Sequence, residues 1–266
     1  MSALADLLGA PKPLVGMVHL LPLPGSPRWG GSIQAVIERA LEDARALAGG
    51  GIDALLVENH GDVPFFRDRV DPAAVAAMTR VITEVRREVS LPLGVNVLKN
   101  DARAALAVAV ATGARFIRVN IHAGAVVADQ GIIESDAAFT LRYRRLLDAD
   151  VKIFADVQAK HGVSLAPVEL EQEARDCVAR GLADVLVVSG KATGEATPLE
   201  DVKRVRSAVR DVPILVGSGV TPDSVAELLS VADGAIVGTA LKRDGRLANP
   251  VDAGRVKRLV QAARGR

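Results

Sequence analysis

The chain has 266 residues, with 33 Lys or Arg against 32 Asp or Glu, so its net charge is +1 near pH 7. This balance leaves no electrostatic footprint for nucleic acid, and a single cysteine, Cys177, excludes an intramolecular disulfide framework. No apolar run approaches the roughly 18 residues needed to cross a bilayer, and the N-terminus lacks the basic cluster of a signal peptide. We expect a cytoplasmic protein with no membrane span and no nucleic-acid partner.

Short β-branched runs alternate with longer amphipathic runs, which is the pattern of parallel strands covered by helices. In chain order, the first half predicts strand 14–19, helix 33–48, strand 54–58, helix 72–89, strand 93–98, helix 102–112, strand 116–121 and helix 137–147. The second half predicts strand 151–157, helix 168–180, strand 185–189, helix 199–209, strand 214–217, helix 224–229, strand 235–237 and helix 252–263.

The residues between these runs support the assignment. A capping residue precedes a proline, the expected first helical residue, in Asp71-Pro72, Thr197-Pro198, Thr221-Pro222 and Asn249-Pro250. Eight βα units in a chain of this length predict a single α/β domain, a (β/α)8 or TIM barrel, over residues 1–266. A doubly wound open sheet is the alternative, but the glycine-rich dinucleotide turn is missing after the first strand.

Polar and titratable side chains follow the predicted strands of the first five units. They are His19, Glu58, Asn59, His60, Asn96, Asn120, His122, Asp156, Lys160 and His161. The carboxyl ends of barrel strands share one rim, where such folds place their chemistry. The sequence therefore predicts an active site at this rim.

The residue types at the rim favour acid–base chemistry. A partly desolvated carboxylate at a strand end acts as acid or base, and Glu58 and Asp156 are the candidates. Asn96 and Asn120 are suited to orient sugar hydroxyls or to donate to a developing oxyanion. Lys160 either pairs with phosphate or forms a Schiff base with the substrate.

The four histidines raise a metal-dependent hydrolase as an alternative. Neutral imidazoles and carboxylates bind zinc and other transition metals. No two histidines are separated by one, three or four residues, so local chelating pairs are missing and a divalent metal stays an alternative rather than an expected cofactor. At least two histidines are expected to be structural, whereas His161, beside Lys160 and close to Asp156, is the candidate for catalysis.

Glycine-rich segments follow the last three predicted strands and predict a phosphate site. The loops after strands 7 and 8 of such barrels often form one, because glycine lets backbone N–H groups approach an anion closely. The residues assigned to it are Ser189, Gly190, Gly217, Ser218, Gly219, Gly238, Thr239 and Lys242. The alternative is that the glycines only make tight turns, and that Lys191 and Lys242 are solvated surface residues.

Longer ordered motifs run through nearly the whole chain. They are Gly16-Met-Val-His-Leu-Leu-Pro-Leu-Pro-Gly-Ser-Pro27, Glu58-Asn-His-Gly-Asp-Val-Pro-Phe65, Gly94-Val-Asn-Val-Leu-Lys-Asn-Asp101, Phe116-Ile-Arg-Val-Asn120, Ala155-Asp-Val-Gln-Ala-Lys-His161 and Val216-Gly-Ser-Gly-Val-Thr221. From about residue 13 to the C-terminus, the chain resembles the BtpA/SgcQ family. The resemblance implies a barrel of the ribulose-phosphate-binding type. His60 and Gln158 depart from the family's usual pattern, in which an aromatic residue and a histidine are more typical.

The resemblance implies no single reaction, because one branch is named for photosystem I biogenesis and another is associated with sugar-metabolism loci. We expect an enzyme that binds a phosphorylated sugar or nucleotide and acts on it by acid–base chemistry. Isomerisation or epimerisation, carbon–carbon cleavage and N-glycosidic cleavage all remain open. A non-catalytic assembly or stability factor is the second alternative, and it should expose an apolar patch. A homo-oligomer is expected from the general frequency of such assemblies.

Overall fold

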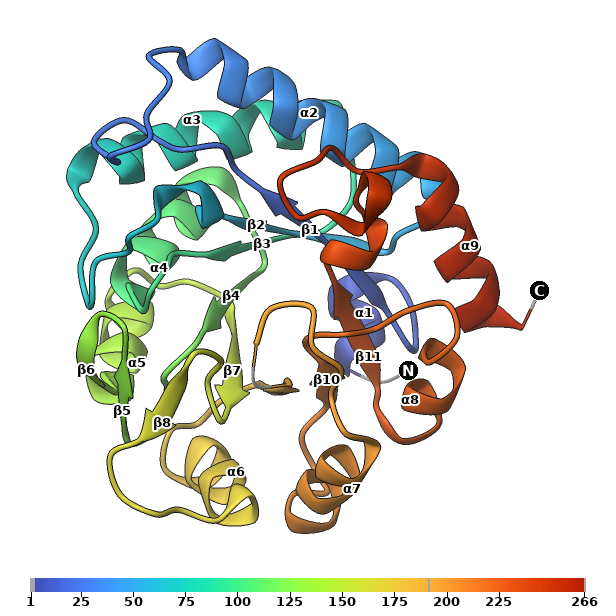
Figure 1. Ribbon diagram of the computed structural model, residues 1–266. Coiled ribbons are helices and arrows are strands. Elements are labelled where there is room, and N and C mark those ends of the chain that lie inside the picture. Colours follow the sequence, from blue (N-terminus) through green and yellow to red (C-terminus); the bar gives the residue numbers. More distant parts are fainter. Residues whose placement is uncertain (1–2, 191, 266) are drawn as a thin grey trace.

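The computed structural model describes residues 3–190 and 192–265, and within them eight parallel strands form a closed barrel surrounded by helices (Figure 1). In order around the barrel, the strands are β1 (Leu14–His19), β2 (Ala54–Glu58), β3 (Leu93–Asn96), β4 (Phe116–Val119), β7 (Lys152–Val157), β9 (Val185–Val188), β10 (Ile214–Val216) and β11 (Gly234–Val237). The barrel closes where β11 pairs with β1. The predicted (β/α)8 barrel is confirmed.

Each barrel strand is followed by a covering helix, as predicted. The helices are α2 (Ile33–Gly50), α3 (Pro72–Glu88), α4 (Ala102–Thr112), α5 (Ala137–Leu146), α6 (Leu170–Ala179), α7 (Leu199–Ala208), α8 (Val225–Val231) and α9 (Ala253–Arg264). Asp71 caps α3 as expected, with its side chain accepting a hydrogen bond from the backbone of Ala73. At Pro198, Pro222 and Pro250 the prediction is wrong, because the helix begins one to three residues after the proline.

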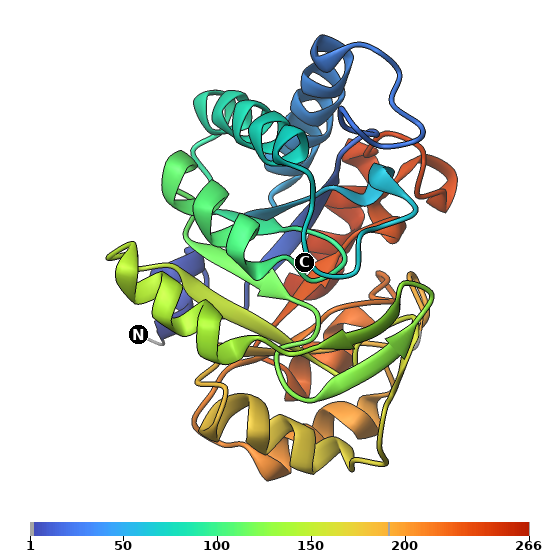
Figure 2. The ribbon, with the colours of Figure 1, turned by 90° about the vertical axis from the view of Figure 1, so that its left-hand side faces the viewer.

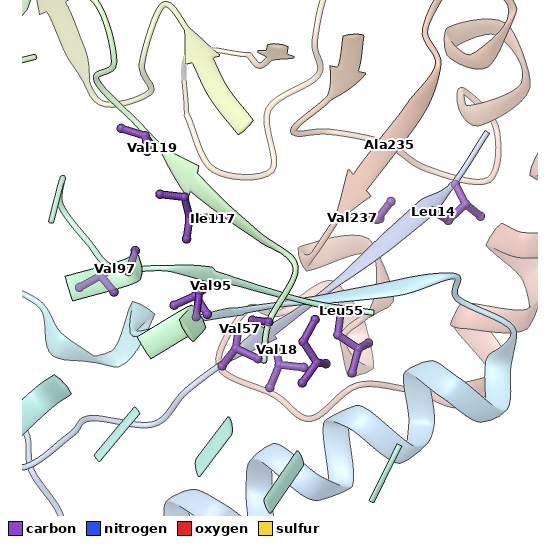
Figure 3. Packing of buried hydrophobic residues seen from close by; sticks show 14 of the residues in the cluster. Leu14, Val18, Leu55, Val57, Val95, Val97, Ile117, Val119, Ala235 and Val237 are labelled. Atoms are coloured by element: carbon purple, nitrogen blue, oxygen red, sulfur yellow. The ribbon is translucent and has the colours of Figure 1, made fainter. Parts of the chain in front are cut away.

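The barrel strands bury both faces, which explains why they are continuously apolar rather than alternating. Their outward side chains pack under the helices, and Figure 3 shows several of them, including Val18, Leu55 and Val57. Their inward side chains form a separate cluster inside the barrel. Phe116 and Phe154 stack there with ring centroids 4.3 Å apart.

A short helix that the sequence did not predict, α1 (Ala3–Leu8), closes the amino-terminal end of the barrel. Its Leu4, Leu7 and Leu8 are buried in the same cluster as the inward side chains of the strands. Figure 2 shows α1 at one end of the barrel and the loops after the strands at the other. Among the described residues, α1 therefore covers the amino-terminal end of the interior, opposite the predicted rim.

Three further strands lie outside the barrel and were also not predicted. They are β5 (Ala125–Ala128), β6 (Gly131–Glu134) and β8 (Gly162–Ser164), which form an antiparallel sheet in the order β6-β5-β8. β5 and β6 follow β4 and β8 follows β7, so the sheet lies at that side of the barrel (Figure 1). None of the helices in the described part of the chain has the length and apolar character to cross a membrane.

Candidate active site

The inner wall of the barrel changes from apolar to polar over a single step of two residues. The innermost core positions are Met17, Leu56, Gly94, Phe116, Phe154, Val187, Leu215 and Ile236. Two residues later on each strand, in the same order, come His19, Glu58, Asn96, Arg118, Asp156, Ser189, Gly217 and Gly238. Because strand side chains alternate between faces, both layers point inward, and the polar layer rests directly on the apolar one.

A cavity of about 260 Å³ opens above this polar layer at the carboxyl ends of the strands. Eleven of the predicted site residues line it, namely His19, Glu58, His60, Asn120, Lys160, His161, Gly217, Ser218, Gly219, Gly238 and Thr239. The other predicted residues, Asn59, Asn96, His122, Asp156, Ser189, Gly190 and Lys242, lie outside its lining. Lys99 and Arg118 line the cavity although the sequence analysis did not select them.

Asp156 is fully engaged beneath the cavity. Arg118 Nε and Nη2 donate to its two carboxylate oxygens at 2.8 and 2.9 Å, and Asn120 Nδ2 donates to Oδ2 at 2.9 Å. Asn96 Nδ2 in turn donates to Asn120 Oδ1 at 3.1 Å. With Asp156 only 1% exposed, the geometry assigns it to holding Arg118 and Asn120 in place rather than to proton transfer.

Glu58 and two histidines occupy the neighbouring part of the wall. His19 Nε2 lies 3.8 Å from Glu58 Oε1, and the His60 ring meets the His19 ring edge-on at 5.2 Å between centroids. Burial, with a smaller contribution from the charge of Lys242, holds the pKa of His19 well below its usual value. His19 is therefore a neutral imidazole near pH 7. Its buried Nδ1 has no hydrogen-bond partner among the described residues.

Two lysines complete the polar side of the cavity. Lys160 Nζ donates to the carbonyl oxygen of Gly217 at 2.9 Å, and Lys99 Nζ donates to the carbonyl oxygen of Lys160 at 3.0 Å. Burial and the charge of Arg118 lower the pKa of Lys160 to about 8. Burial also lowers the pKa of Lys99, although the charge of Asp156 opposes this. Both amines line the cavity without a carboxylate within salt-bridge distance among the described residues.

The opposite side of the cavity is built from close backbone. A Cβ on Gly217 would lie 2.5 Å from Ser189 Oγ, and one on Gly238 would lie 2.9 Å from the His19 ring. Gly219 has a φ of 64°, and a Cβ there would lie 2.3 Å from the Cα of Ala196. The backbone N–H groups of Gly219 and Gly238 have no hydrogen-bond partner among the described residues. These glycines make tight turns and also leave donors at the cavity.

Ser218, Ser189 and Gly190 shape this side differently from one another. Ser218 lines the cavity, but its Oγ accepts a hydrogen bond from the backbone N–H of Gly190 at 2.8 Å, which ties two loops together. The buried Oγ of Ser189 has no partner among the described residues. His161 lies at the exposed mouth, with Nε2 3.0 Å from Thr193 Oγ1.

Lys242 and His122 do not reach the cavity. Lys242 is 0% exposed, and its Nζ donates to Asp43 Oδ2 at 2.6 Å on the helix side of the barrel wall, so it is neither a ligand contact nor a solvated side chain. His122 Nε2 lies 2.8 Å from the Gly181 carbonyl oxygen, and burial lowers the pKa of its ring. Lys191 lies outside the described residues.

Asn59 also serves the frame of the site. Its Oδ1 accepts a hydrogen bond from the backbone of Leu98 at 2.7 Å, and its Nδ2 donates to Asp62 Oδ2 at 3.1 Å. Within residues 3–190 and 192–265, no three His, Cys, Asp or Glu side chains are grouped so that they could hold a metal ion. The described residues therefore supply no ligand set for the divalent metal that the histidines suggested.

The fold and this polar cavity define a (β/α)8 barrel of the TIM-barrel class with a candidate active site at its carboxyl-terminal rim. Residues 10–265 match the BtpA family, and the chain belongs to that family. The predicted resemblance is confirmed over nearly the whole chain.

Relatives of the chain carry different names. It is 47% identical over 251 residues to the photosystem I biogenesis protein BtpA of Synechocystis, covering 94% of this chain and 88% of that protein. It is 48% identical over 253 residues to an uncharacterized protein of Thermococcus kodakarensis, covering 95% of each. It is 35% identical over 264 residues to the putative sgc region protein SgcQ of Escherichia coli, covering 98% and 97%.

Solved structures share the fold at low sequence identity. The phosphoribosylanthranilate isomerase of Pyrococcus furiosus has a TM-score of 0.59 at 13% identity, and the match covers 96% of this chain and 100% of that one. A native KDPGal structure has a TM-score of 0.59 at 13% identity and covers 96% of each chain. At this identity the likeness concerns the barrel alone.

Proposed function

We propose that this protein is an enzyme that binds a phosphorylated sugar or nucleotide in the rim cavity and acts on it by acid–base chemistry. The observation that carries the proposal is the layer of polar side chains that replaces the apolar wall at six of the eight strand ends, with glycine at the other two, directly beneath the cavity. A barrel that served only as a scaffold would have no need to desolvate so many polar groups, because burying them is costly.

The cavity's charge favours an anionic ligand. Arg118 is neutralised by Asp156, whereas Lys99 and Lys160 hydrogen-bond only to backbone carbonyl oxygens among the described residues. Glu58 is the remaining carboxylate in the lining, so the cations outnumber the anions there. A phosphate group would restore the balance and return part of the electrostatic energy lost when the lysines were desolvated.

The phosphate would bind on the glycine side, at Gly217–Gly219 and Gly238–Thr239. Backbone N–H groups of Gly219 and Gly238 are available there, and the absent Cβ atoms allow an anion to approach. The reacting carbons would then face Glu58, which acts as the acid or base beside neutral His19. Asn120, fixed by Asp156, would orient a hydroxyl group of the substrate.

A thermal-shift screen against phosphorylated sugars and nucleotides tests the proposal. A ligand present at a hundred times its dissociation constant adds about 2.7 kcal/mol of stability. We expect at least one phosphorylated compound to raise the melting temperature, and its dephosphorylated counterpart to have no effect. If no phosphorylated compound stabilises the protein, or if the dephosphorylated forms act equally well, the proposal is wrong.

A second candidate function, a non-catalytic assembly factor, is favoured by one surface. Val127, Ile132 and Val163 are direct cross-strand partners on β5, β6 and β8 and are 45%, 46% and 74% exposed. This apolar row is of the kind that marks contact sites. Contact between copies of this chain is another use of the row, and the homo-oligomer stays a prediction.

Complementation of a Synechocystis strain that lacks its BtpA relative separates the two functions. The variant Glu58→Gln removes the proposed acid–base group, while Val127→Ser with Ile132→Ser changes only the apolar row. An enzyme requires Glu58 and tolerates the serine changes. The opposite pattern of photosystem I accumulation would favour the assembly factor.

A further inference from the structure

Lys160, which is partly buried, and Lys99, which is buried, differ from the buried cations Arg118 and Lys242. Arg118 and Lys242 each have a carboxylate partner, Asp156 and Asp43, at hydrogen-bond distance. Among the described residues, the amines of Lys160 and Lys99 each have one hydrogen bond, to a backbone carbonyl oxygen. A desolvated lysine without a counterion is stabilised in its neutral form, which is the nucleophilic form of the amine.

Lys160 is the better placed of the two lysines. Its Nζ lies 2.9 Å from the Gly217 carbonyl oxygen, at the start of the loop assigned to phosphate. The charge of Glu58 acts on the same amine and raises its pKa, against the larger lowering by burial and by Arg118. Lys160 therefore lies where the glycine side and the acid–base side of the cavity meet. Lys99 instead donates to the carbonyl oxygen of Lys160 and acts as a positioning residue for it.

The chain around Lys160 is held in a conformation that extended strands do not adopt. Gln158 and His161 have φ angles of 55° and 57°, in the left-handed region that side chains disfavour. Glu173 Oε1 accepts a hydrogen bond from the backbone N–H of Gln158 at 2.9 Å, and Thr193 contacts His161. These contacts and that of Lys99 hold both ends of the segment, and Lys160 lies between them among the residues that line the cavity.

We propose that Lys160 is a nucleophile that forms an imine with the aldehyde or ketone group of a small phosphorylated substrate. The proposal rests on the proposed function, since the phosphate is what holds the carbonyl group beside the amine. The cavity of about 260 Å³ favours a small substrate, because pockets for drug-sized ligands hold roughly 300–1,000 Å³.

The step balances with the uptake of one proton from water. The neutral Lys160 amine attacks the carbonyl carbon, and the carbonyl π electrons become the lone pair of an oxygen that takes up a proton. One amine proton passes through Glu58 to that oxygen, a second proton from water converts the hydroxyl group into a leaving water molecule, and the nitrogen lone pair forms the C=N bond that replaces the C=O bond. Glu58 accepts and returns the proton. The protonated imine then withdraws electrons from the adjacent C–H or C–C bond, the change that an isomerase or a carbon–carbon lyase requires.

Reductive trapping tests the proposal. The protein is incubated with dihydroxyacetone phosphate, glyceraldehyde 3-phosphate or ribose 5-phosphate, with and without sodium cyanoborohydride, and the adduct is located by peptide mass spectrometry. We expect an adduct on Lys160 that requires both compound and reductant. It should be lost in Lys160→Arg, which keeps the charge, and kept in Lys203→Arg, which changes an exposed lysine far from the cavity. Mapping in the unaltered protein keeps the result meaningful even if Lys160→Arg is unstable.

Thermal shift with the same three compounds separates the two proposals. Stabilisation by a compound that gives no adduct, or an adduct on Lys99 or on surface lysines alone, overturns the imine and leaves the phosphate-binding enzyme standing. If none of the three compounds stabilises the protein and none forms an adduct, the imine is overturned, and the result also counts against the proposed function. Stabilisation that persists in Lys160→Arg, with loss of the adduct, is the result that supports both.

Discussion

The guanidinium of Arg118 binds both carboxylate oxygens of Asp156, at 2.8 and 2.9 Å, where neither side chain is more than 5% exposed. The pair spans neighbouring barrel strands, β4 and β7, just above the stacked rings of Phe116 and Phe154. Its role is to hold Asn120 and the floor of the cavity in one arrangement. In the proposed reaction, Glu58 rather than Asp156 is therefore the carboxylate assigned to proton transfer.

Asp156→Asn should destabilise the protein by about 3–5 kcal/mol, because it leaves a buried guanidinium without its counterion. Urea unfolding followed by circular dichroism measures the change. Asp150→Asn is the matched control, since Asp150 pairs with Lys152 at the surface and such pairs contribute about 0–1 kcal/mol. If both variants were equally stable, the buried pair would not have the role given to it.

The sequence predicted the barrel well because a strand buried on both faces and an amphipathic helix each leave a strong local pattern. It did not predict β5, β6 and β8, whose apolar side chains alternate over only three or four residues. The six residues of α1 are likewise too short for a helical period to stand out, and their burial depends on an interior formed by distant strands.

Gly217→Ala and Gly238→Ala should each weaken binding of any phosphorylated ligand found by the screen at least tenfold, or by about 1.4 kcal/mol. An added Cβ would collide with Ser189 at the first position and with His19 at the second, displacing the backbone that faces the phosphate. Gly49→Ala, where the new Cβ meets nothing within 4 Å, is the control. Isothermal titration calorimetry measures the affinities, and wild-type affinity in both cavity variants would contradict the assignment.

Lys242→Met should lower stability by about 3–5 kcal/mol and leave ligand affinity unchanged. The substitution removes the ammonium partner of Asp43, which is 0% exposed, and leaves its carboxylate only Arg39 Nε at 3.5 Å and the hydrogen bond from the backbone of Val251. Unfolding and calorimetry on the same preparation give both quantities. If the folded variant lost affinity for the phosphorylated ligand but kept its free energy of unfolding, Lys242 would have to be assigned to the phosphate site.

Stability should fall as the pH drops below about 6.5, and His19 should account for part of the fall. Burial lowers the pKa of His19 in the folded state, so the unfolded chain binds more protons below its ordinary value of 6.5. The slope reaches at most about 1.4 kcal/mol per pH unit for one such group. Urea unfolding is measured between pH 7.5 and 5 in buffers of roughly equal strength. The free energy of unfolding should then fall less steeply with decreasing pH in His19→Gln than in the unaltered protein. An unchanged slope would mean that His19 is already charged in the folded protein.

Trapping of Lys160 should become faster as the pH rises through about 8, the pKa set by burial and by Arg118. Below that value the amine is protonated and cannot attack. Lys99 also lowers this pKa, whereas Asp156 and Glu58 raise it, so Glu58→Gln should move the midpoint of the rate profile to lower pH. The measurement is the rate of adduct formation between pH 6.5 and 9.5, a range roughly centred on the expected midpoint of the profile. A profile without an inflection in that range would contradict the assignment.

The gathering of polar side chains around one cavity at the rim was predictable from the sequence, but the contacts of each side chain were not. The alternation of the strand gives Arg118 the same inward direction as Phe116 and Asn120, but an arginine inside an apolar run carries no local signal of its own beyond that alternation. Lys242 shows the reverse error. Its partner Asp43 is 199 residues away in the chain, and no local pattern links the two.

A crystal structure of the protein soaked with ribose 5-phosphate is the strongest test of the proposed phosphate site on the glycine side of the rim. We expect the phosphate group to lie within hydrogen-bond distance of the backbone nitrogens of Gly219 and Gly238, with the sugar directed toward Glu58 and Lys160. An empty rim at a saturating concentration, or a phosphate bound elsewhere on the barrel, would contradict it.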